Sequence, residues 1–428
     1  MKIFLSLFLL YVKKSFLSNP DVKCLFTESA YTLIDMKKVA EAYCSYLIEN
    51  YEDSKEKVCL KTKMKVKNFD ESINKKVFAI DIGGTYLKIC IVHFINNESN
   101  VLNYEKFEIK RELKTKEVDL FEWVAQMLNE YLSDKGEETT GIKEGAMTFS
   151  YPIKQDNCHN GEILSFGKDF PFRPIDLSEP KDPVKLLNNA LKCLKIDLEI
   201  KIILNDANAT FLSGYLTDSS TKMGIVLGTG SNCAFYTGDM VNDQIELINS
   251  EWGKFDNVSF KKSKYDDIIK ETVLSENAVY QNVDYMIGGV KFIEIINLMY
   301  KDFTNTNKTI SKEEIAQIRN QSDENNGNIE NLELKKKIYE YFKSRSISIL
   351  ASLVIGIVEK NNFKGKIGIN LNGSAFNGCG EWKKLKEMLD ELARSMEITD
   401  VEFSMSFNEH ASLLGCAYAL VCNPKSID

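Results

Sequence analysis

The chain has 428 residues, which is too long for one ordinary hydrophobic core and predicts two domains. Its 44% apolar and 27% charged residues are typical of a globular protein. The formal net charge of −8 argues against nucleic acid or an anionic membrane surface as the main partner, although a nucleotide needs only a local positive site.

The first predicted element is an apolar run, Ile3–Val12, that follows Lys2 and precedes Lys13 and Lys14. Its 10 residues are too few to span a bilayer as a helix, but they match the core of a signal peptide. A good small-residue cleavage site does not follow. We expect residues 1–20 to be a signal peptide and the protein to be secreted; the alternative is a buried or fraying helix in a cytoplasmic protein.

Helical spacing of apolar residues predicts a helix over residues 31–50, and a Lys-rich segment follows it. Residues 78–82 and 87–94 predict a hairpin that residues 107–109 extend. The later predicted elements are a helix at 120–132, a strand at 145–151, a helix at 184–194, a buried strand at 202–205, a helix at 207–216, a second sheet from 223 to 236, a long helix at 334–358, a strand at 367–371, and helices at 381–395 and 411–421.

Residues 304–331 are polar and have no hydrophobic period, which predicts a surface insertion. Strand and helix patterns alternate elsewhere, so the fold class is α/β. The 10 cysteines form no Cys-x-x-Cys pair, and we expect buried free thiols rather than disulfides or a zinc site. With only 3 histidines, a histidine-rich metal site is not expected.

Two short segments of the same kind carry the strongest functional signal. Each is an apolar strand that ends in glycine and threonine and is followed by another strand; they are Phe78–Thr85 and Gly224–Asn232. Glycines at such a turn let backbone N–H groups approach an anion, and threonine adds a hydroxyl. Two of them predict a duplicated scaffold that holds a polyphosphate from opposite sides, and therefore an ATP-handling enzyme.

Asn205 and Asp206 directly follow the predicted buried strand. A carboxylate at the carboxyl end of such a strand lies where ligands bind in open α/β sheets. Asp206 could there accept a proton from a substrate hydroxyl that attacks phosphorus. The structural alternative is that Asp206 only caps the helix that follows.

Other polar residues follow predicted strands and could converge on a polyol, whose hydroxyls need both donors and acceptors. They are Ser150, Lys168, Asn232 and Glu251. Lys168 taken by itself could equally be a solvated surface lysine.

These motifs together resemble those of the eukaryotic-type hexokinases, in the actin-like sugar kinase superfamily. The resemblance runs from about Thr32 to Val421. It rests on six segments in the family's order: 78–85 for the first phosphate motif, 148–152 for the sugar, 204–206 for the catalytic aspartate, 222–232 for the second phosphate motif, 248–256 for the sugar glutamate and 372–374 for the adenosine.

The resemblance implies a two-lobed actin-like (ribonuclease H-like) ATPase fold in which each lobe is a mixed sheet flanked by helices. The small lobe would comprise residues 77–206 and 408–428, and the large lobe residues 21–76 and 207–407. The implied activity is phosphorylation of the 6-hydroxyl of glucose or a related hexose by Mg-ATP, as in glycolysis. The lobes would close over the sugar.

The resemblance also implies roles for individual residues. Asp206 would be the general base, with Lys168 beside it as a second catalytic residue. The sugar would be bound by Ser150, Tyr151, Pro152, Lys168, Asn205, Asp206, Asn232, Glu251 and Asp284. ATP would be bound by Asp81, Gly83, Gly84, Thr85, Lys88, Gly228, Thr229, Gly373, Ser374 and Ser412. Asp81 would hold Mg²⁺ through water.

The chain departs from the family pattern at five places. Gly167 replaces a threonine, Asp284 a glutamate and Lys88 an arginine. Asn372 replaces an aspartate, and His410-Ala411-Ser412 stands where Gly-Ser-Gly is usual. The last two lie at the adenosine end and motivate a rival hypothesis, a hexose sensor or regulator without useful catalysis.

A different actin-like kinase, acting on glycerol, acetate or N-acetyl sugars, is disfavoured by residues 148–152 and 249–256. We expect no nucleic-acid partner and no stable membrane span. An exported parasite enzyme, microsporidian-like, would be one setting for a signal peptide on such a kinase. The sequence predicts neither the preferred hexose nor the oligomeric state.

Overall fold

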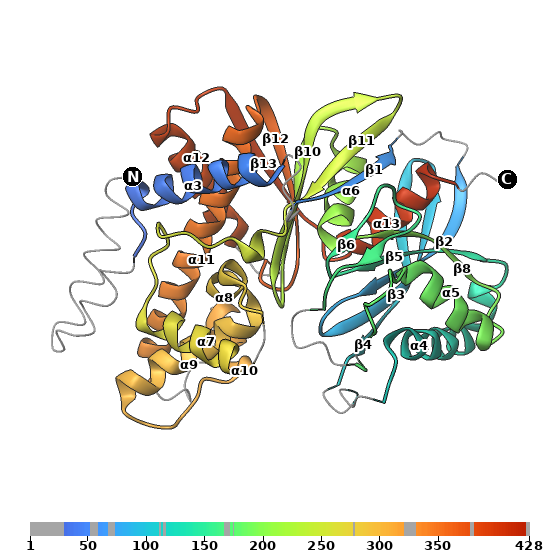
Figure 1. Cartoon of the computed structure of the whole chain (residues 1–428), viewed down its shortest axis with the longest axis horizontal. Helices are drawn as coiled ribbons and strands as arrows, with labels where there is room; N and C mark the ends of the chain where they lie inside the picture. Colours follow the sequence, from blue (N-terminus) through green and yellow to red (C-terminus); the bar gives the residue numbers. More distant parts are fainter. Residues whose placement is uncertain are drawn as a thin grey trace.

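The protein is described by a computed structural model that covers residues 30–51, 59–66, 73–110, 113, 117–166, 172–173, 175–276, 279–320, 331–376 and 381–424. Two lobes lie side by side, and each is built on its own β-sheet (Figure 1). Helices flank both sheets, so the chain has the α/β architecture that the alternating pattern predicts. The predicted signal peptide lies outside the described residues.

The sheet of the first lobe has the strand order β4-β3-β2-β5-β8. Its strands are β2 (Asn74–Ile82), β3 (Tyr86–Ile95), β4 (Glu98–Glu108), β5 (Glu144–Phe149) and β8 (Glu199–Leu204). The β2–β3 hairpin is antiparallel, as expected, whereas β2, β5 and β8 pair in parallel. Parallel pairing brings the carboxyl ends of these three strands to one edge of the sheet.

The sheet of the second lobe has the order β1-β11-β10-β9-β12-β13. Its strands are β1 (Leu60–Lys65), β9 (Thr221–Leu227), β10 (Ser231–Val241), β11 (Gln244–Asn249), β12 (Gly365–Asn372) and β13 (Val401–Phe407). From β11 to β13 the pairing repeats the first sheet: two antiparallel joints, then two parallel ones. This repeat confirms the duplicated scaffold that the two glycine turns predict.

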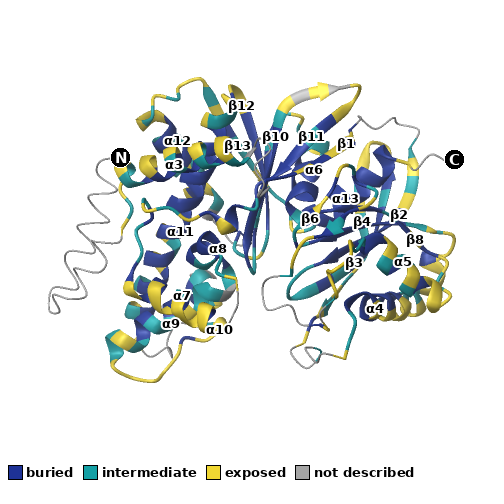
Figure 2. Ribbon diagram, in the orientation of Figure 1, coloured by how far each residue is buried: buried dark blue, intermediate teal, exposed yellow. Residues whose placement is uncertain are grey.

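Buried apolar faces hold the helices against the sheets (Figure 2). In the second lobe α3 (Leu33–Tyr51), α11 (Leu332–Asn361) and α12 (Glu381–Ser395) share one core with the sheet. In the first lobe α4 (Leu120–Lys135) and α5 (Pro183–Cys193) cover one face. Helix α11 is long and apolar enough to cross a membrane, but 89% of its most apolar stretch is buried in the protein.

Helices α6 (Asp206–Thr217) and α13 (Ala411–Cys422) pack on each other between the two sheets, near the centre of Figure 1. Helix α6 also contacts β9 and α13 contacts β5, so the pair joins the lobes. Their backbones approach very closely, because a Cβ added at Gly415 would lie 1.8 Å from the carbonyl oxygen of Ala209. Only glycine is compatible with this crossing.

Four helices extend the second lobe beyond its sheet (Figure 1). They are α7 (Lys264–Ser275), α8 (Asn282–Ile287), α9 (Gly289–Thr304) and α10 (Lys312–Asn320). The predicted surface insertion over 304–331 contains helix α10, which has no predicted counterpart; within it Ile318 is buried against this group and Ile315 packs on the same cluster. So sparse an apolar pattern gives no clear period in the sequence.

Strands β1 and β13 lie where no strand is predicted, and so do the two-residue strands β6 (Ile153–Lys154) and β7 (Glu162–Ile163). In β1 the alternation is regular, with Leu60, Thr62 and Met64 buried and the intervening lysines exposed, but the lysines dominate the composition of the segment.

The cysteine thiols follow the expectation in part: within the described residues eight cysteines are free and six of these are buried, whereas Cys193 is exposed.

Candidate active site

The site begins where β5 and β8 of the first sheet end. Ser150 follows β5, and Asn205 and Asp206 follow β8 at the start of α6. Asn205 is the residue that caps α6, since its Oδ1 accepts from Ala207 N at 3.0 Å. Asp206 Oδ1 accepts from the same N–H at 2.9 Å, and its Oδ2 accepts from the Ser150 hydroxyl at 2.6 Å. The orientation of the Asp206 carboxylate at the carboxyl end of β8 is therefore fixed by these hydrogen bonds.

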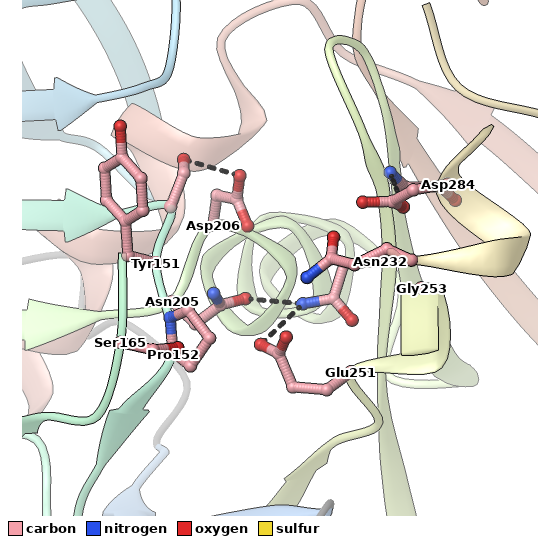
Figure 3. A pocket seen from close by; sticks show the side chains of 12 residues that line it. Tyr151, Pro152, Ser165, Asn205, Asp206, Asn232, Glu251, Gly253 and Asp284 are labelled. Carbon is pink, nitrogen blue, oxygen red and sulfur yellow. Dashed lines mark hydrogen bonds between the residues drawn. The ribbon is translucent and has the colours of Figure 1, made fainter. Parts of the chain in front are cut away.

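A polar pocket between the lobes gathers most of the predicted sugar residues (Figure 3). Its lining residues are Ser150, Tyr151, Pro152, Ser165, Asn205, Asp206, Ser231, Asn232, Glu251, Gly253, Gln281 and Asp284. Asp206 lies on the first-lobe side in Figure 3, and Glu251 and Asp284 lie on the opposite side. Three carboxylates with neighbouring hydroxyl and amide groups can pair with a ligand that carries several hydroxyls. Lys168, the remaining predicted sugar residue, lies outside the described residues.

A network of amides joins the two sides of the pocket. Asn232 Nδ2 lies 3.2 Å from Asn205 Oδ1, 2.7 Å from Asn249 Oδ1 and 3.5 Å from Glu251 Oε1. Asn249 Nδ2 donates to Glu251 Oε1 at 2.9 Å. Glu251 has a left-handed backbone with φ 47°, which is uncommon for a residue other than glycine. The amides of Asn232 and Asn249 hold the Glu251 carboxylate toward the pocket.

Asn249 is a functional residue that sequence reasoning missed. It is 2% exposed and contacts Glu251, yet it lies inside the 248–256 segment without a predicted role. Its position at the end of a predicted strand, two residues before the sugar glutamate, was the available signal. Side chains at i and i+2 of a strand share a face, although the turn after Asn249 makes that rule weaker there.

If the pocket binds a hexose, as the family resemblance implies, we expect Asn249→Ala to weaken that binding about tenfold, because Glu251 loses one charge-assisted hydrogen bond and Asn232 loses an acceptor. Titration calorimetry with glucose measures the change. The matched control is Asn188→Ala, which removes two hydrogen bonds to Ile200 far from the pocket. That control should lower the melting temperature and leave the glucose Kd unchanged; equal loss of affinity in both variants would contradict the role of Asn249.

Asp284 is 5% exposed and is held tightly at the second-lobe end of the pocket. Its Oδ1 accepts from the backbone N–H of Ser231 at 2.6 Å. A Cβ at Gly253 would lie 2.9 Å from both Oδ1 and Cγ of Asp284, so glycine leaves the carboxylate its space. The shorter arm, noted from the sequence as a departure from the family's glutamate, still places the carboxylate on the pocket wall.

Asp81, at the end of β2, has three hydrogen-bond donors. Lys88 Nζ and the Ser412 hydroxyl donate to Oδ2 at 2.7 and 2.9 Å, and Thr148 donates to Oδ1 at 2.7 Å. Burial disfavours the charged carboxylate, but the Lys88 ammonium and these hydrogen bonds outweigh it and lower the pKa of Asp81. The attraction of Asp81 in turn raises the pKa of Lys88. The pair is therefore ionised at neutral pH.

The two glycine turns meet across the cleft. Thr85 Oγ1 lies 3.0 Å from Thr229 Oγ1, and either hydroxyl can be the donor. Gly83, Gly84 and Gly228 lie beside these threonines and are half-buried. Two threonine hydroxyls thus face one another from opposite lobes, each beside a glycine turn of the kind that can bind phosphate. The N–H groups of Gly83 and Gly228 donate within their own turns, to Tyr86 O and Gly230 O.

The residues predicted to bind adenosine differ from one another in exposure and in hydrogen-bond partners. Gly373 has φ 111°, and a Cβ there would lie 2.2 Å from Leu227 O, so the turn after β12 needs glycine. Ser374 next to it is exposed, whereas Ser412 is 1% exposed and bonds to Asp81. Asn372 uses its amide to bind the backbone oxygen of Asn408 at 2.7 Å. Ser412 is therefore buried against Asp81, whereas Ser374 lies at the surface.

His410 precedes α13 and packs its ring on Tyr104, with the ring centroids 4.6 Å apart. Burial lowers its pKa, while the neighbouring Glu409 opposes that shift. The ring is therefore largely neutral at pH 7.

Within the described residues no group of three or more His, Cys, Asp and Glu side chains could hold a metal ion. The residues near the phosphate turns still suit Mg²⁺, because they offer hard oxygen atoms: the Asp81 carboxylate and the hydroxyls of Thr85 and Thr229. Asp81 already accepts from three donors, one of them a lysine. It therefore fits a contact to hydrated Mg²⁺ through water better than direct coordination.

Comparison with known proteins places this geometry in context. One family model described as "Hexokinase" matches residues 36–216, and a second with the same description matches residues 222–422. Hexokinase-2 of Candida albicans is 30% identical over 255 residues, which are 55% of this chain and 51% of the relative. Hexokinase-1 of Saccharomyces cerevisiae is 27% identical over 263 residues, 56% of this chain and 52% of the relative. The chain spans about half the length of the curated relatives it matches.

Solved structures show the same fold. A hexokinase from Schistosoma mansoni complexed with glucose has a TM-score of 0.75 at 16% identity, over 92% of this chain and 96% of that chain. A glucokinase from Balamuthia mandrillaris in complex with glucose has a TM-score of 0.52 at 14% identity, over 90% and 98%. The two-lobed fold with two mixed sheets is confirmed.

Proposed function

The chain belongs to the hexokinase family, and from that membership we propose that it transfers a phosphoryl group from ATP to the 6-hydroxyl of glucose or a related hexose. The observation that carries the proposal is the placement of Asp206, which lines the polar pocket together with Glu251 and Asp284. The pocket adjoins the first phosphate turn, since Ser150 N donates to Ile82 O directly before Gly83. An acceptor hydroxyl and a phosphate would therefore meet beside one carboxylate.

In the proposed reaction Asp206 takes the proton of the 6-hydroxyl as its oxygen attacks the γ-phosphorus. A new bond forms between phosphorus and that oxygen. The bond from the γ-phosphorus to the bridging oxygen breaks, and ADP leaves with the electron pair. Ser150 donates to Asp206 Oδ2 and so keeps the carboxylate pointing at the substrate.

The phosphates would lie between the turn at Gly83–Thr85 and the turn at Gly228–Gly230. The hydroxyls of Thr85 and Thr229 would donate to them, together with backbone N–H groups other than those of Gly83 and Gly228, which bond within their own turns. Lys88 and Asp81 stand beside the first turn. Mg²⁺ held through water by Asp81 would neutralise charge on the phosphates. Positioning and charge neutralisation are the main requirements of phosphoryl transfer, and these residues can supply both.

Closure of the lobes over the sugar would exclude water and limit wasteful hydrolysis of ATP. The direct contact between Thr85 and Thr229 supports a cleft that can shut at this point. Lys168 keeps its proposed role at the sugar and at the reacting oxygen as an expectation from the family resemblance.

A coupled assay on the purified full chain with glucose and Mg-ATP tests the activity. We expect turnover that requires both substrates, and a panel of hexoses then ranks the acceptors. The rival function is a hexose sensor, which the engagement of Asn372 and Ser412 within the protein favours. A sensor would bind glucose in calorimetry and form no ATP-dependent product, and that result would overturn the kinase proposal.

Export is a separate proposal that rests on residues 2–14 alone. A signal peptide there would place the kinase outside the cell that makes it, and an exported enzyme of a microsporidian-like parasite would be one setting. N-terminal sequencing of material from the culture medium tests it. Intact Met1 in the cytosolic fraction, with none exported, would refute it.

A further inference from the structure

Ser165 lines the polar pocket, although it lies outside the set of residues predicted to bind the sugar. The residue is exposed, and its hydroxyl makes no hydrogen bond to the described residues. Between Tyr151 and Ser178 the sequence has no other hydroxyl side chain, and glycine stands at position 167, where the family pattern has threonine. Ser165 is therefore the hydroxyl side chain that this segment can offer to a ligand.

The chain on both sides of Ser165 is tied to the wall of the pocket. Leu164 N donates to Pro152 O at 3.0 Å. Phe166 packs edge-on against Tyr151, with the ring centroids 5.6 Å apart. Tyr151 and Pro152 themselves line the pocket, and the pairing of β6 with β7 joins the same two segments just before these contacts. Ser165 is consequently held at the wall by both of its neighbours.

Other polar groups of the pocket already bond within the protein. The Ser150 hydroxyl donates to Asp206. The side chain of Asn232 uses its Nδ2 group in the amide network, and its Oδ1 accepts from Cys233 N at 2.8 Å. The Ser165 hydroxyl is not committed in this way, so it can both donate to and accept from a hydroxyl of a ligand.

The chemistry of a hexose indicates which hydroxyl this would be. In the proposed reaction the 6-hydroxyl lies at Asp206. In a pyranose ring C6 is attached to C5, whose neighbours in the ring are the ring oxygen and C4, so the C4 hydroxyl is the next one along the ring. Ser165 lies on the same side of the pocket as Asp206 in Figure 3, whereas Glu251 and Asp284 lie on the opposite side.

We propose that the Ser165 hydroxyl binds the C4 hydroxyl of the hexose, which makes Ser165 a specificity-determining residue for the acceptor sugar. This inference rests on the proposed function, because the position of the 6-hydroxyl at Asp206 sets the orientation of the ring. A sugar that lacks the C4 hydroxyl loses this contact. A sugar altered at C2, on the far side of the ring, keeps it.

The test combines Ser165→Ala with three sugars: glucose, 4-deoxyglucose and 2-deoxyglucose. Titration calorimetry measures each Kd, with 4-deoxyglucose titrated in competition with glucose. We expect the Kd values of glucose and 2-deoxyglucose to rise by the same factor, about three- to tenfold, which corresponds to one hydrogen bond. The Kd of 4-deoxyglucose should stay within about twofold, because that sugar has no C4 hydroxyl with which to make the contact.

Two further variants separate this contact from a structural effect. Ser165→Thr retains the hydroxyl and should keep the glucose Kd within about twofold of the unmodified value. Ser133→Ala is the matched control, because Ser133 is an exposed serine of α4 whose hydroxyl donates to Asn129 O away from the pocket. That control should leave the Kd of all three sugars unchanged.

A Kd for 4-deoxyglucose that rises in Ser165→Ala as much as the Kd for glucose overturns the inference, because Ser165 then acts through the structure of the pocket or at another hydroxyl. An unchanged glucose Kd in Ser165→Ala overturns it as well. Failure of the proposed function is a different result: the unmodified protein would form no sugar phosphate from ATP and any hexose, whatever the calorimetry of the variants shows.

Discussion

Replacing Asp206 with asparagine is expected to lower kcat by about 10²–10⁴-fold, because the reaction then lacks the group that accepts the proton. Asparagine retains an oxygen for the N–H of Ala207, so the start of α6 should stay intact. The glucose Kd should change only a few-fold, since the other pocket residues remain. Steady-state kinetics measures the first quantity and titration calorimetry the second.

The matched control for that variant is Asp182→Asn. Asp182 also accepts from a backbone N–H at the start of a helix, α5, but it lies away from the pocket. Its replacement should cost some stability and no turnover. If Asp206→Asn kept the kcat of the unmodified protein, Asp206 would be only a structural residue at the helix start.

Replacing Asp81 with alanine is expected to lower both activity and stability. The Lys88 ammonium, whose side chain is 23% exposed, would lose its carboxylate partner and face the phosphate turn unpaired. Breaking such a largely buried pair should cost about 2–4 kcal/mol of unfolding free energy, somewhat below the range for fully buried pairs because of that exposure. The KM for Mg-ATP should rise by about tenfold or more, since the turn loses its anchor and the contact proposed for hydrated Mg²⁺.

Lys366→Ala is the matched control for the ion pair. Lys366 lies 2.7 Å from Asp218, the distance found in the Lys88–Asp81 pair, but its side chain and that of its partner are 50% and 41% exposed. Solvent screening should limit its effect to about 0–1 kcal/mol. Chemical unfolding of the variants compares the two pairs, and equal losses would show that burial does not strengthen the Asp81 cluster.

The Asp81 cluster also predicts a pH dependence of stability. The folded pKa of Asp81 lies below its ordinary value, so the carboxylate contributes its stabilisation above that value and loses it as pH falls through the folded pKa. The difference in unfolding free energy between the unmodified protein and Asp81→Asn should therefore be constant from about pH 5 to 8 and shrink below about pH 4. A difference that grew toward low pH would contradict this sign.

Much of the fold follows from local patterns. The hairpin at β2–β3 and the helices α6, α12 and α13 agree with the predicted elements to within a few residues. Strands β1 and β13 and helices α7 to α10 were not predicted. Lysines mask a period of two in β1, and α8 and α10 are short. Such elements are ordered by the surface on which they pack rather than by their own composition.

Part of the candidate site, like part of the fold, could be predicted from the sequence, and the rest could not. The pocket gathers Ser150, Asn205, Asp206 and Glu251 because each lies within two residues after the end of a strand, which is visible in the sequence. The contact of Asn249 with Glu251 is visible only in the structure, because it depends on the exact placement of its neighbours rather than on the pattern of its own segment. Ser412 shows the same limit of sequence reasoning: its segment is recognisable from the sequence, but its hydrogen-bond partner Asp81 is visible only in the structure.

The sequence by itself determined the local geometry: glycines that permit two turns, and an aspartate placed after a buried strand. These depend on backbone freedom and on side-chain period, which are properties of a few neighbouring residues. Only the tertiary structure decided which polar atoms meet. Thr85 and Thr229 are 144 residues apart, and Ser412 and Asp81 are 331 apart. Strand pairing and the packing of α13 bring them together, because both bury apolar surface contributed by distant parts of the chain.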